Sequence, residues 1–178
     1  ESSNLQAGAN KGFALLFEMN MLFQAFLGRL LLNALPEGCT LRKEGPRYYL
    51  AHNAEGRGRF QMKPDFCVLR GAKVVAIVDA KWKRLDPEGE YGKWGVNQAD
   101  VYQLMAYSQL YGCRDVMLLY PHHGDLPPEP ICTPYAIARE GAEETLHVAT
   151  LVMTGPSGSH VDALKTVLDR MLPAKVPV

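Results

Sequence analysis

The order of apolar and polar positions divides the chain into helices and strands. Residues 11–35 are rich in Leu, Phe, Met and Ala and contain no proline, which predicts a long, mostly buried helix. A second helix is predicted between Asn97, which can cap it, and Gly112, which can end it. A third is expected from a cap at Ser159, with four side chains facing inward: Val161, Leu164, Leu168 and Met171.

Short β-branched and aromatic runs predict strands between these helices. Residues 47–52 and 60–70 flank the turn-forming run 53–58 and predict a hairpin. Residues 73–81 form a continuous β-branched run, which is typical of a central strand buried on both faces. Three further strands are expected, at residues 115–120 (stopped by Pro121), 131–138 and 145–153. Together the elements predict an α/β domain with a mixed sheet flanked by helices.

Length and composition agree with one folded domain. A chain of 178 residues suffices for a single core, and fractions of 47% hydrophobic and 21% charged residues argue against a disordered chain. Because no run approaches roughly 20 apolar residues, we expect no membrane-spanning segment. Residues 1–10 lack a signal-peptide pattern and are interpreted as a linker or tag remnant preceding a domain of residues 11–178.

Cysteine placement and charge narrow the class of protein. The 4 cysteines are scattered without a Cys-x-x-Cys pair, so we expect reduced thiols in a cytoplasmic protein rather than a disulfide framework or a zinc site. The formal net charge is zero, with 19 basic and 19 acidic residues. A surface that binds nucleic acid would therefore have to be a local patch.

Two short motifs place charged side chains inside otherwise apolar stretches: Lys63-Pro64-Asp65 and Asp79-Ala80-Lys81. Residues two apart in a strand point to the same face, so Asp79 and Lys81 should project from one side of the sheet. Pro64 cannot donate to a strand ladder, which frees Asp65 on the preceding strand to lie beside them. We expect the three side chains to share one site.

The paired carboxylates point to a divalent cation. Two carboxylates on adjacent strands repel each other unless a cation is present, and hard oxygen ligands favour Mg²⁺, with Mn²⁺ able to replace it. Such an ion can polarise a phosphodiester and lower the pKa of an attacking water. Lys81 could orient or deprotonate that water and neutralise charge on the phosphate. The structural alternative is an Asp79–Lys81 ion pair at a strand end, with Asp65 in a Pro-Asp turn.

Four ordered runs carry a family resemblance. They are Leu15-Leu16-Phe17-Glu18-Met19-Asn20, Lys63-Pro64-Asp65-Phe66, Val78-Asp79-Ala80-Lys81-Trp82-Lys83 and Asp100-Val101-Tyr102-Gln103-Leu104-Met105-Ala106-Tyr107. Over most of its length the chain resembles the PD-(D/E)xK nuclease superfamily and, more closely, the McrC family of nuclease subunits from 5-methylcytosine-specific McrBC restriction systems. The resemblance implies a restriction-endonuclease-like fold, Mg²⁺-dependent cleavage of double-stranded DNA and an AAA+ GTPase partner of the McrB type.

The resemblance also implies roles for side chains outside the two short motifs. Glu18, an acid in the first predicted helix, can reach the metal, or it is a partly exposed residue of an amphipathic helix. Gln103 and Tyr107 match a Gln-x-x-x-Tyr motif of RecB-like nucleases. They share one helix face, expected opposite the apolar stripe of Val101, Leu104 and Met105. They would position DNA or the catalytic strand, or else bond a neighbouring loop.

Three basic residues are candidates for contact with DNA. Arg57, Arg59 and Lys83 could contact backbone phosphates, or they are simply solvated. Two alternatives to an endonuclease stay open. One is a RecB-like DNA-repair exonuclease, some of which hold an iron-sulfur cluster on cysteines. The other is a non-catalytic DNA-binding or assembly module with the same fold.

Overall fold

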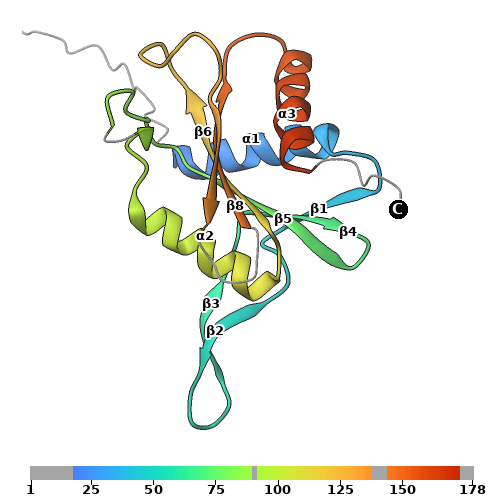
Figure 1. Cartoon of the computed structure of the whole chain (residues 1–178). Coiled ribbons are helices and arrows are strands. Elements are labelled where there is room, and N and C mark those ends of the chain that lie inside the picture. The colour runs from blue at the N-terminus through green and yellow to red at the C-terminus, as the bar shows by residue number, and fades with distance from the viewer. Residues whose placement is uncertain (1–17, 90–91, 138–143, 173–178) are drawn as a thin grey trace, which may run out of the picture.

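A mixed β-sheet covered on both faces by helices forms the body of the protein (Figure 1). The computed structural model describes residues 18–89, 92–137 and 144–172. Helices α1 (Met19–Ala34) and α3 (Ser157–Met171) pack together on one face of the sheet, and α2 (Gln98–Tyr111) covers the other. The expected α/β class with a mixed sheet flanked by helices is confirmed.

The six strands of this sheet run in the order β1-β4-β5-β6-β8-β7. Strands β5 (Lys73–Ala80), β6 (Asp115–His122) and β8 (Glu144–Val152) are parallel neighbours. The outer strands pair antiparallel: β1 (Cys39–Lys43) and β4 (Phe66–Arg70) on one side, β7 (Cys132–Ile137) on the other. Parallel strands need a crossover, which α2 supplies between β5 and β6. The carboxyl end of β5 therefore lies at the same sheet edge as the amino-terminal half of α2.

Side-chain alternation along β5 divides the core into two clusters. Ala76 and Val78 belong to the cluster beneath α1 and α3, whereas Ile77 belongs to the cluster beneath α2. Helix α1 fills its side with apolar residues at helical spacing: Phe23, Leu27, Leu30, Leu31 and Ala34. By the same alternation, the residue after Val78 faces α2. That residue is Asp79.

The prediction of a single strand over residues 60–70 is wrong. Pro64 divides it into β3 (Gly58–Met62) and β4, because proline cannot donate to the ladder. Strand β3 pairs instead with β2 (Tyr48–His52) in a separate two-stranded sheet, so the predicted hairpin exists but stands apart from the body. Strand β1, which the sequence reading did not predict, pairs with β4 in its place.

Smaller differences concern element ends. Strand β6 does not stop at Pro121 but continues to His122. By that point β5 has ended opposite Leu119, so Pro121 pairs only with β8 and its missing N–H is not needed. Helix α3 begins at Ser157 after Pro156, and the Ser159 hydroxyl donates to the Pro156 carbonyl rather than capping the helix.

Some expectations concern residues outside the described part of the chain. The linker or tag remnant of residues 1–10, the start of the predicted first helix and Ala138 lie outside the described residues. All four cysteines are free thiols, as expected. Among the described residues, no helix combines the length and apolar character that crossing a membrane requires.

The cap of α2 is open to a direct test. The Asn97 side chain accepts a hydrogen bond of 2.8 Å from the Ala99 N–H. We expect Asn97→Ala to lower the free energy of unfolding by about 1 kcal/mol in urea titration. Asn33→Ala is the matched control, because that side chain donates only to the Arg29 carbonyl on the exposed end of α1, and a change under about 0.5 kcal/mol is expected. Equal losses would contradict the cap.

Candidate active site at the carboxyl end of β5

Asp79 and Lys81 form an ion pair where β5 leaves the sheet. Asp79 is 3% exposed and faces α2. The Lys81 N–H donates to the Leu119 carbonyl at 2.9 Å, so strand geometry persists one residue beyond β5 and Lys81 returns to the face of Asp79. Its Nζ lies 2.6 Å from Asp79 Oδ2. The expected common face of these two side chains is confirmed.

Asp65 joins them from the neighbouring strand. Phe66 pairs with Val78, so continuing the antiparallel register by one residue sets Asp65 opposite Asp79. Asp65 Oδ2 accepts a 2.8 Å hydrogen bond from the Ala80 N–H, and Oδ1 accepts one of 2.7 Å from Gln24 Nε2 on α1. The structure therefore brings Asp65, Asp79 and Lys81 into one site.

The pKa values of Asp65 and Asp79 are both raised, so their negative charge is unfavourable in this site and a nearby cation would stabilise it. Burial, and then repulsion by Asp79, raises the pKa of Asp65 to about 6. Burial also raises the pKa of Asp79, although the Lys81 ammonium opposes this shift. Burial acts to lower the pKa of Lys81, but Asp79 and Asp100 outweigh it and raise that pKa. Lys81 is thus an ammonium at neutral pH, while the two carboxylates carry an unfavourable negative charge.

Gln103 and Tyr107 connect Lys81 with the segment that precedes Asp65. Lys81 Nζ donates to Gln103 Oε1 at 3.1 Å, and Gln103 Nε2 donates to the Tyr107 hydroxyl at 2.8 Å. That hydroxyl donates to the Lys63 carbonyl at 3.0 Å, next to Pro64. Burial and the charge of Asp79 raise the pKa of Tyr107 to about 12, which keeps it a donor. These bonds join Lys81 to the main chain next to Pro64, and a role of Gln103 and Tyr107 in positioning DNA or the strand of Asp65 stays a prediction.

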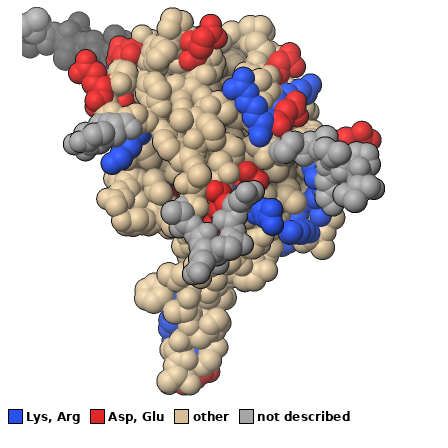
Figure 2. Space-filling model, viewed as in Figure 1, with Lys and Arg blue, Asp and Glu red and all other residues tan. Residues whose placement is uncertain are grey.

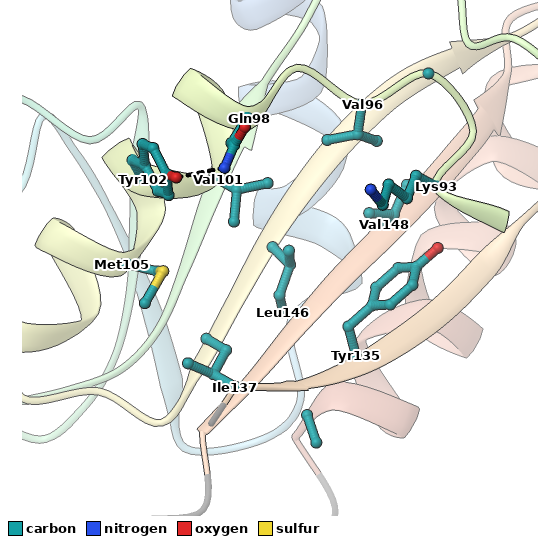
Figure 3. Close-up of a pocket in the computed structure, with 12 residues that line it drawn as sticks. Lys93, Val96, Gln98, Val101, Tyr102, Met105, Tyr135, Ile137, Leu146 and Val148 are labelled. Atoms are coloured by element: carbon teal, nitrogen blue, oxygen red, sulfur yellow. Dashed lines mark hydrogen bonds between the residues drawn. The ribbon is translucent and has the colours of Figure 1, made fainter. Parts of the chain in front are cut away.

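The expected faces of α2 need correction. Tyr107 is 2% exposed and packs in the same cluster as Leu104, so it does not lie opposite an apolar stripe. Val101 and Met105 instead line a cavity of about 660 Å³ between α2, β7 and β8 (Figure 3). The buried face of α2 is polar in part: Asp100, Leu104, Tyr107, Ser108 and Tyr111. Polar residues enter it because they bond the site and the sheet.

Asp100 is a member of the site that the sequence analysis names only within a family-like run and does not predict as a site residue. Its Oδ2 lies 2.7 Å from Lys83 Nζ, and its Oδ1 lies 3.5 Å from Lys81 Nζ. Asp79, Lys81, Asp100 and Lys83 thus alternate in charge. An acid in the first helical turn ordinarily complements the helix dipole, so the sequence offered no signal for this contact.

Gln24 was also missed, and the expected reach of Glu18 to the metal stays a prediction. Glu18 is exposed at the start of α1, where its side chain makes no capping hydrogen bond. Among the described residues it forms no hydrogen bond or ion pair with Asp65 or Asp79. The α1 side chain that reaches Asp65 is Gln24. Its signal was a polar residue within the apolar run from Met21 to Leu32.

The basic residues expected at DNA occupy different places. Lys83 lies beside the site and pairs with Asp100, with its side chain 50% exposed. Arg57 and Arg59 lie on the β2–β3 hairpin, exposed and away from the carboxylates. The structure therefore joins Lys83 to the site but assigns the two arginines to a separate surface.

The donor set fits Mg²⁺ better than a metal that needs a full protein cage. Within the described residues, the buried Asp79 Oδ2 has no hydrogen-bond partner apart from its ion pair with Lys81, and the buried Tyr120 hydroxyl has none. Burial raises the pKa of Tyr120, and the charges of Asp100 and Asp79 raise it further. No group of three or more His, Cys, Asp or Glu residues could hold a metal within the described part of the chain. Two carboxylates completed by water and phosphate oxygens suit Mg²⁺.

A family comparison decides the class of protein. The sequence model of the family described as McrBC 5-methylcytosine restriction system component matches residues 1–121. The chain belongs to this family. The resemblance to McrC proteins drawn from the sequence motifs is thereby confirmed. No curated protein matches the chain.

A solved structure shares the fold of this McrBC-family chain. It is a chain of the refined half-complex from the tetradecameric assembly of Thermococcus gammatolerans McrB AAA+ hexamers with bound McrC. The TM-score is 0.60 at 19% identity, and the match covers 86% of this chain and 33% of that one. The chain thus spans about a third of its structural relative, and a likeness at this identity shows the fold alone.

Removal of one carboxylate charge should stabilise this McrBC-family fold when no metal is bound. Because the pKa of Asp65 rises from 3.8 to about 6 on folding, its contribution to stability is present below pH 3.8 and is lost as pH rises through 6. Asp65→Asn should abolish this loss, and rotation of the Gln24 amide can keep both hydrogen bonds. Urea titrations in EDTA should show the variant gaining roughly 1–2 kcal/mol on wild type between pH 4 and pH 7.5, after allowance for solvent screening.

The control for that experiment is Asp162→Asn on α3. Its side chain is 77% exposed and pairs only loosely with Lys165, at 3.6 Å. We expect no comparable pH dependence from this change. A constant difference between Asp65→Asn and wild type across the pH range would contradict the rise in the pKa of Asp65 on folding that burial and Asp79 produce.

The Tyr107 hydroxyl should matter to stability far more than that of a neighbouring tyrosine. Tyr107→Phe leaves the Lys63 carbonyl and the Gln103 amide without their shared partner, and we expect a loss of about 1–2 kcal/mol in urea titration. Tyr102→Phe is the matched control, because the Tyr102 ring is 58% exposed and its hydroxyl bonds only Gln98. Similar losses from both changes would contradict a linking role for Tyr107.

Proposed function

We propose that this chain is a Mg²⁺-dependent endonuclease domain of a McrBC-type restriction system and hydrolyses phosphodiester bonds in double-stranded DNA. The observation that carries the proposal is the placement of Asp65 and Asp79 on adjacent strands with the Lys81 ammonium 2.6 Å from Asp79. Family membership supports the restriction setting. Lys83 already lies beside Asp100. A further cation would therefore be attracted most strongly by Asp65 and Asp79.

Each side chain has a distinct part in the proposed reaction. Asp65 and Asp79 would hold the metal ion, which supplies a polarised phosphate and a water of lowered pKa. The Ala80 N–H and Gln24 fix the two oxygens of Asp65. Lys81, kept protonated by its acidic neighbours, is suited to neutralise charge developing on the phosphate rather than to accept a proton.

The proposed partner is an AAA+ GTPase of the McrB type. The support is the structural relative, which comes from an assembly of McrB AAA+ hexamers with bound McrC. A RecB-like exonuclease carrying an iron-sulfur cluster is not supported, because all four cysteines are described and they form no metal-holding group. A DNA substrate without ends distinguishes an endonuclease from an exonuclease, because only the endonuclease needs no DNA end.

Cleavage of a covalently closed plasmid by the full complex tests the proposal. We expect Asp79→Ala and Lys81→Ala to lower the cleavage rate by roughly 10²–10³-fold or more, since each removes charge stabilisation from the transition state. EDTA should abolish cleavage, and Mg²⁺ or Mn²⁺ should restore it in wild type alone.

Lys165→Ala on α3 is the control, because it removes one exposed lysine far from the carboxylates and should leave the rate unchanged. Circular dichroism should show all variants folded. Plasmid cleavage that persists in Asp79→Ala would reject the nuclease site, and a requirement for linear DNA would replace the endonuclease with an exonuclease.

A further inference from the structure

The β2–β3 hairpin forms an arm that protrudes from the body. We use the word arm for residues 46–63, which include both strands and the turn between them. The arm has its own two-stranded sheet, paired from Tyr48 with Met62 to His52 with Gly58. Figures 1 and 2 show it extending beyond the body as a narrow projection. Strands of five residues span about 17 Å, so the arm is long enough to follow a DNA groove.

Large apolar side chains on the arm lie in solvent. Phe60 is 74% exposed, Leu50 55% and Tyr48 43%. Phe60 also has a φ of +58°, a conformation that side chains of its size rarely adopt and that costs roughly 1–3 kcal/mol. Isolated two-stranded hairpins are marginally stable in water. Exposed apolar side chains and backbone strain on such a hairpin indicate that it contacts another molecule.

The direction of the arm is fixed at its base. The Tyr111 hydroxyl on α2 donates to the Pro46 carbonyl at 2.7 Å. The Tyr48 ring stands edge-on to the Tyr111 ring, with centroids 4.7 Å apart. Further out, Tyr49 packs so closely over Gly58 that a Cβ there would lie 2.4 Å from its ring. The arm is therefore stiffened and held in one orientation relative to α2.

The charge of the arm matches a polyanion. Residues 46–63 include four cations, Arg47, Arg57, Arg59 and Lys63, against one anion, Glu55, in a chain whose formal net charge is zero. Arg57, Arg59 and Lys63 are exposed. The local basic patch that a neutral nucleic-acid-binding protein requires is thus on the arm.

The arm is continuous with the proposed active site. Strand β3 ends at Met62, three residues before Asp65, and the Lys63 carbonyl between them is bonded to Tyr107. A duplex whose phosphate lies at Asp65 and Asp79 therefore passes the base of the arm.

We propose that the arm inserts into the major groove of the duplex being cut, with Arg57 and Arg59 on phosphates and Phe60 against base edges. The proposal rests on the function proposed above and assigns the surface that grips the substrate. The major groove, about 12 Å wide, admits a two-stranded β-ribbon in undistorted DNA, whereas the minor groove, about 6 Å wide, has to be widened or the duplex bent to receive one. Phosphate contacts give affinity that falls with salt, and the apolar contact gives affinity that does not.

Fluorescence anisotropy with a labelled duplex of mixed sequence, without Mg²⁺ so that nothing is cut, measures binding by the chain. We expect the double variant Arg57→Ala/Arg59→Ala to weaken binding roughly tenfold or more and to reduce the slope of log affinity against log salt by about 2. Phe60→Ala should weaken binding several-fold without changing that slope. All three side chains are exposed, so the melting temperature should stay within a few degrees.

The control removes the same charge elsewhere. Lys165→Ala/Arg170→Ala takes two exposed cations from α3, at the end of the molecule opposite the arm (Figure 1), and should change neither affinity nor slope. A duplex carrying glucosyl groups on its cytosines, which fill the major groove, should bind weakly and be insensitive to Phe60→Ala.

Three results would overturn the arm proposal. They are equal effects of the arm and control double variants, undiminished binding of the glucosylated duplex, and arm variants that lose assembly with the GTPase subunit while keeping their affinity for DNA. The last result would make the arm a protein-docking surface. Plasmid cleavage by the full complex separates this failure from failure of the proposed function. Unchanged duplex binding together with Asp79-dependent cleavage rejects the arm alone.

Discussion

The repulsion between Asp65 and Asp79 is the constraint around which the site is built. Antiparallel pairing of β4 with β5 sets the buried Asp79 and the partly buried Asp65 opposite each other, and burial together with repulsion by Asp79 raises the pKa of Asp65 to about 6. The Lys81 ammonium offsets the charge of Asp79, and the Ala80 N–H and the Gln24 amide donate hydrogen bonds to Asp65. A divalent ion would reduce the repulsion that remains between the two carboxylates. The free energy that this repulsion costs on folding would therefore add to the affinity for the ion.

Helix α2 holds this arrangement together. As the crossover between β5 and β6, it brings its first turns to the edge where β5 ends. Asp100 pairs with Lys83 and approaches Lys81, while Gln103 and Tyr107 link Lys81 to the main chain before Asp65. A change in the packing of this one helix would shift the ammonium and a carboxylate together. The same helix, through Tyr111, sets the direction of the arm.

The proposed chemistry and the proposed DNA contact thus fall on different sheets of the molecule. The large sheet is buried on both faces and keeps the carboxylates rigid and poorly solvated. The small sheet exposes apolar and basic side chains, including Phe60 and Leu50, while Tyr48 at its base packs against Tyr111 of the body. Pro64 lies at the division, because it ends the pairing of β3 and leaves Asp65 free to turn into the site.

Local patterns in the sequence determined the helices, most strands, the cap at Asn97 and the shared face of Asp79 and Lys81, because periodicity and capping depend on near neighbours. Only the tertiary structure decided which distant side chains meet the site. Gln24 lies 41 residues from Asp65 and Asp100 lies 17 from Lys83, and no spacing rule links them. It also decided that residues 60–70 divide into an arm and a core strand. Strand pairing depends on which partner edge is available, and that is set by the packing of the whole chain.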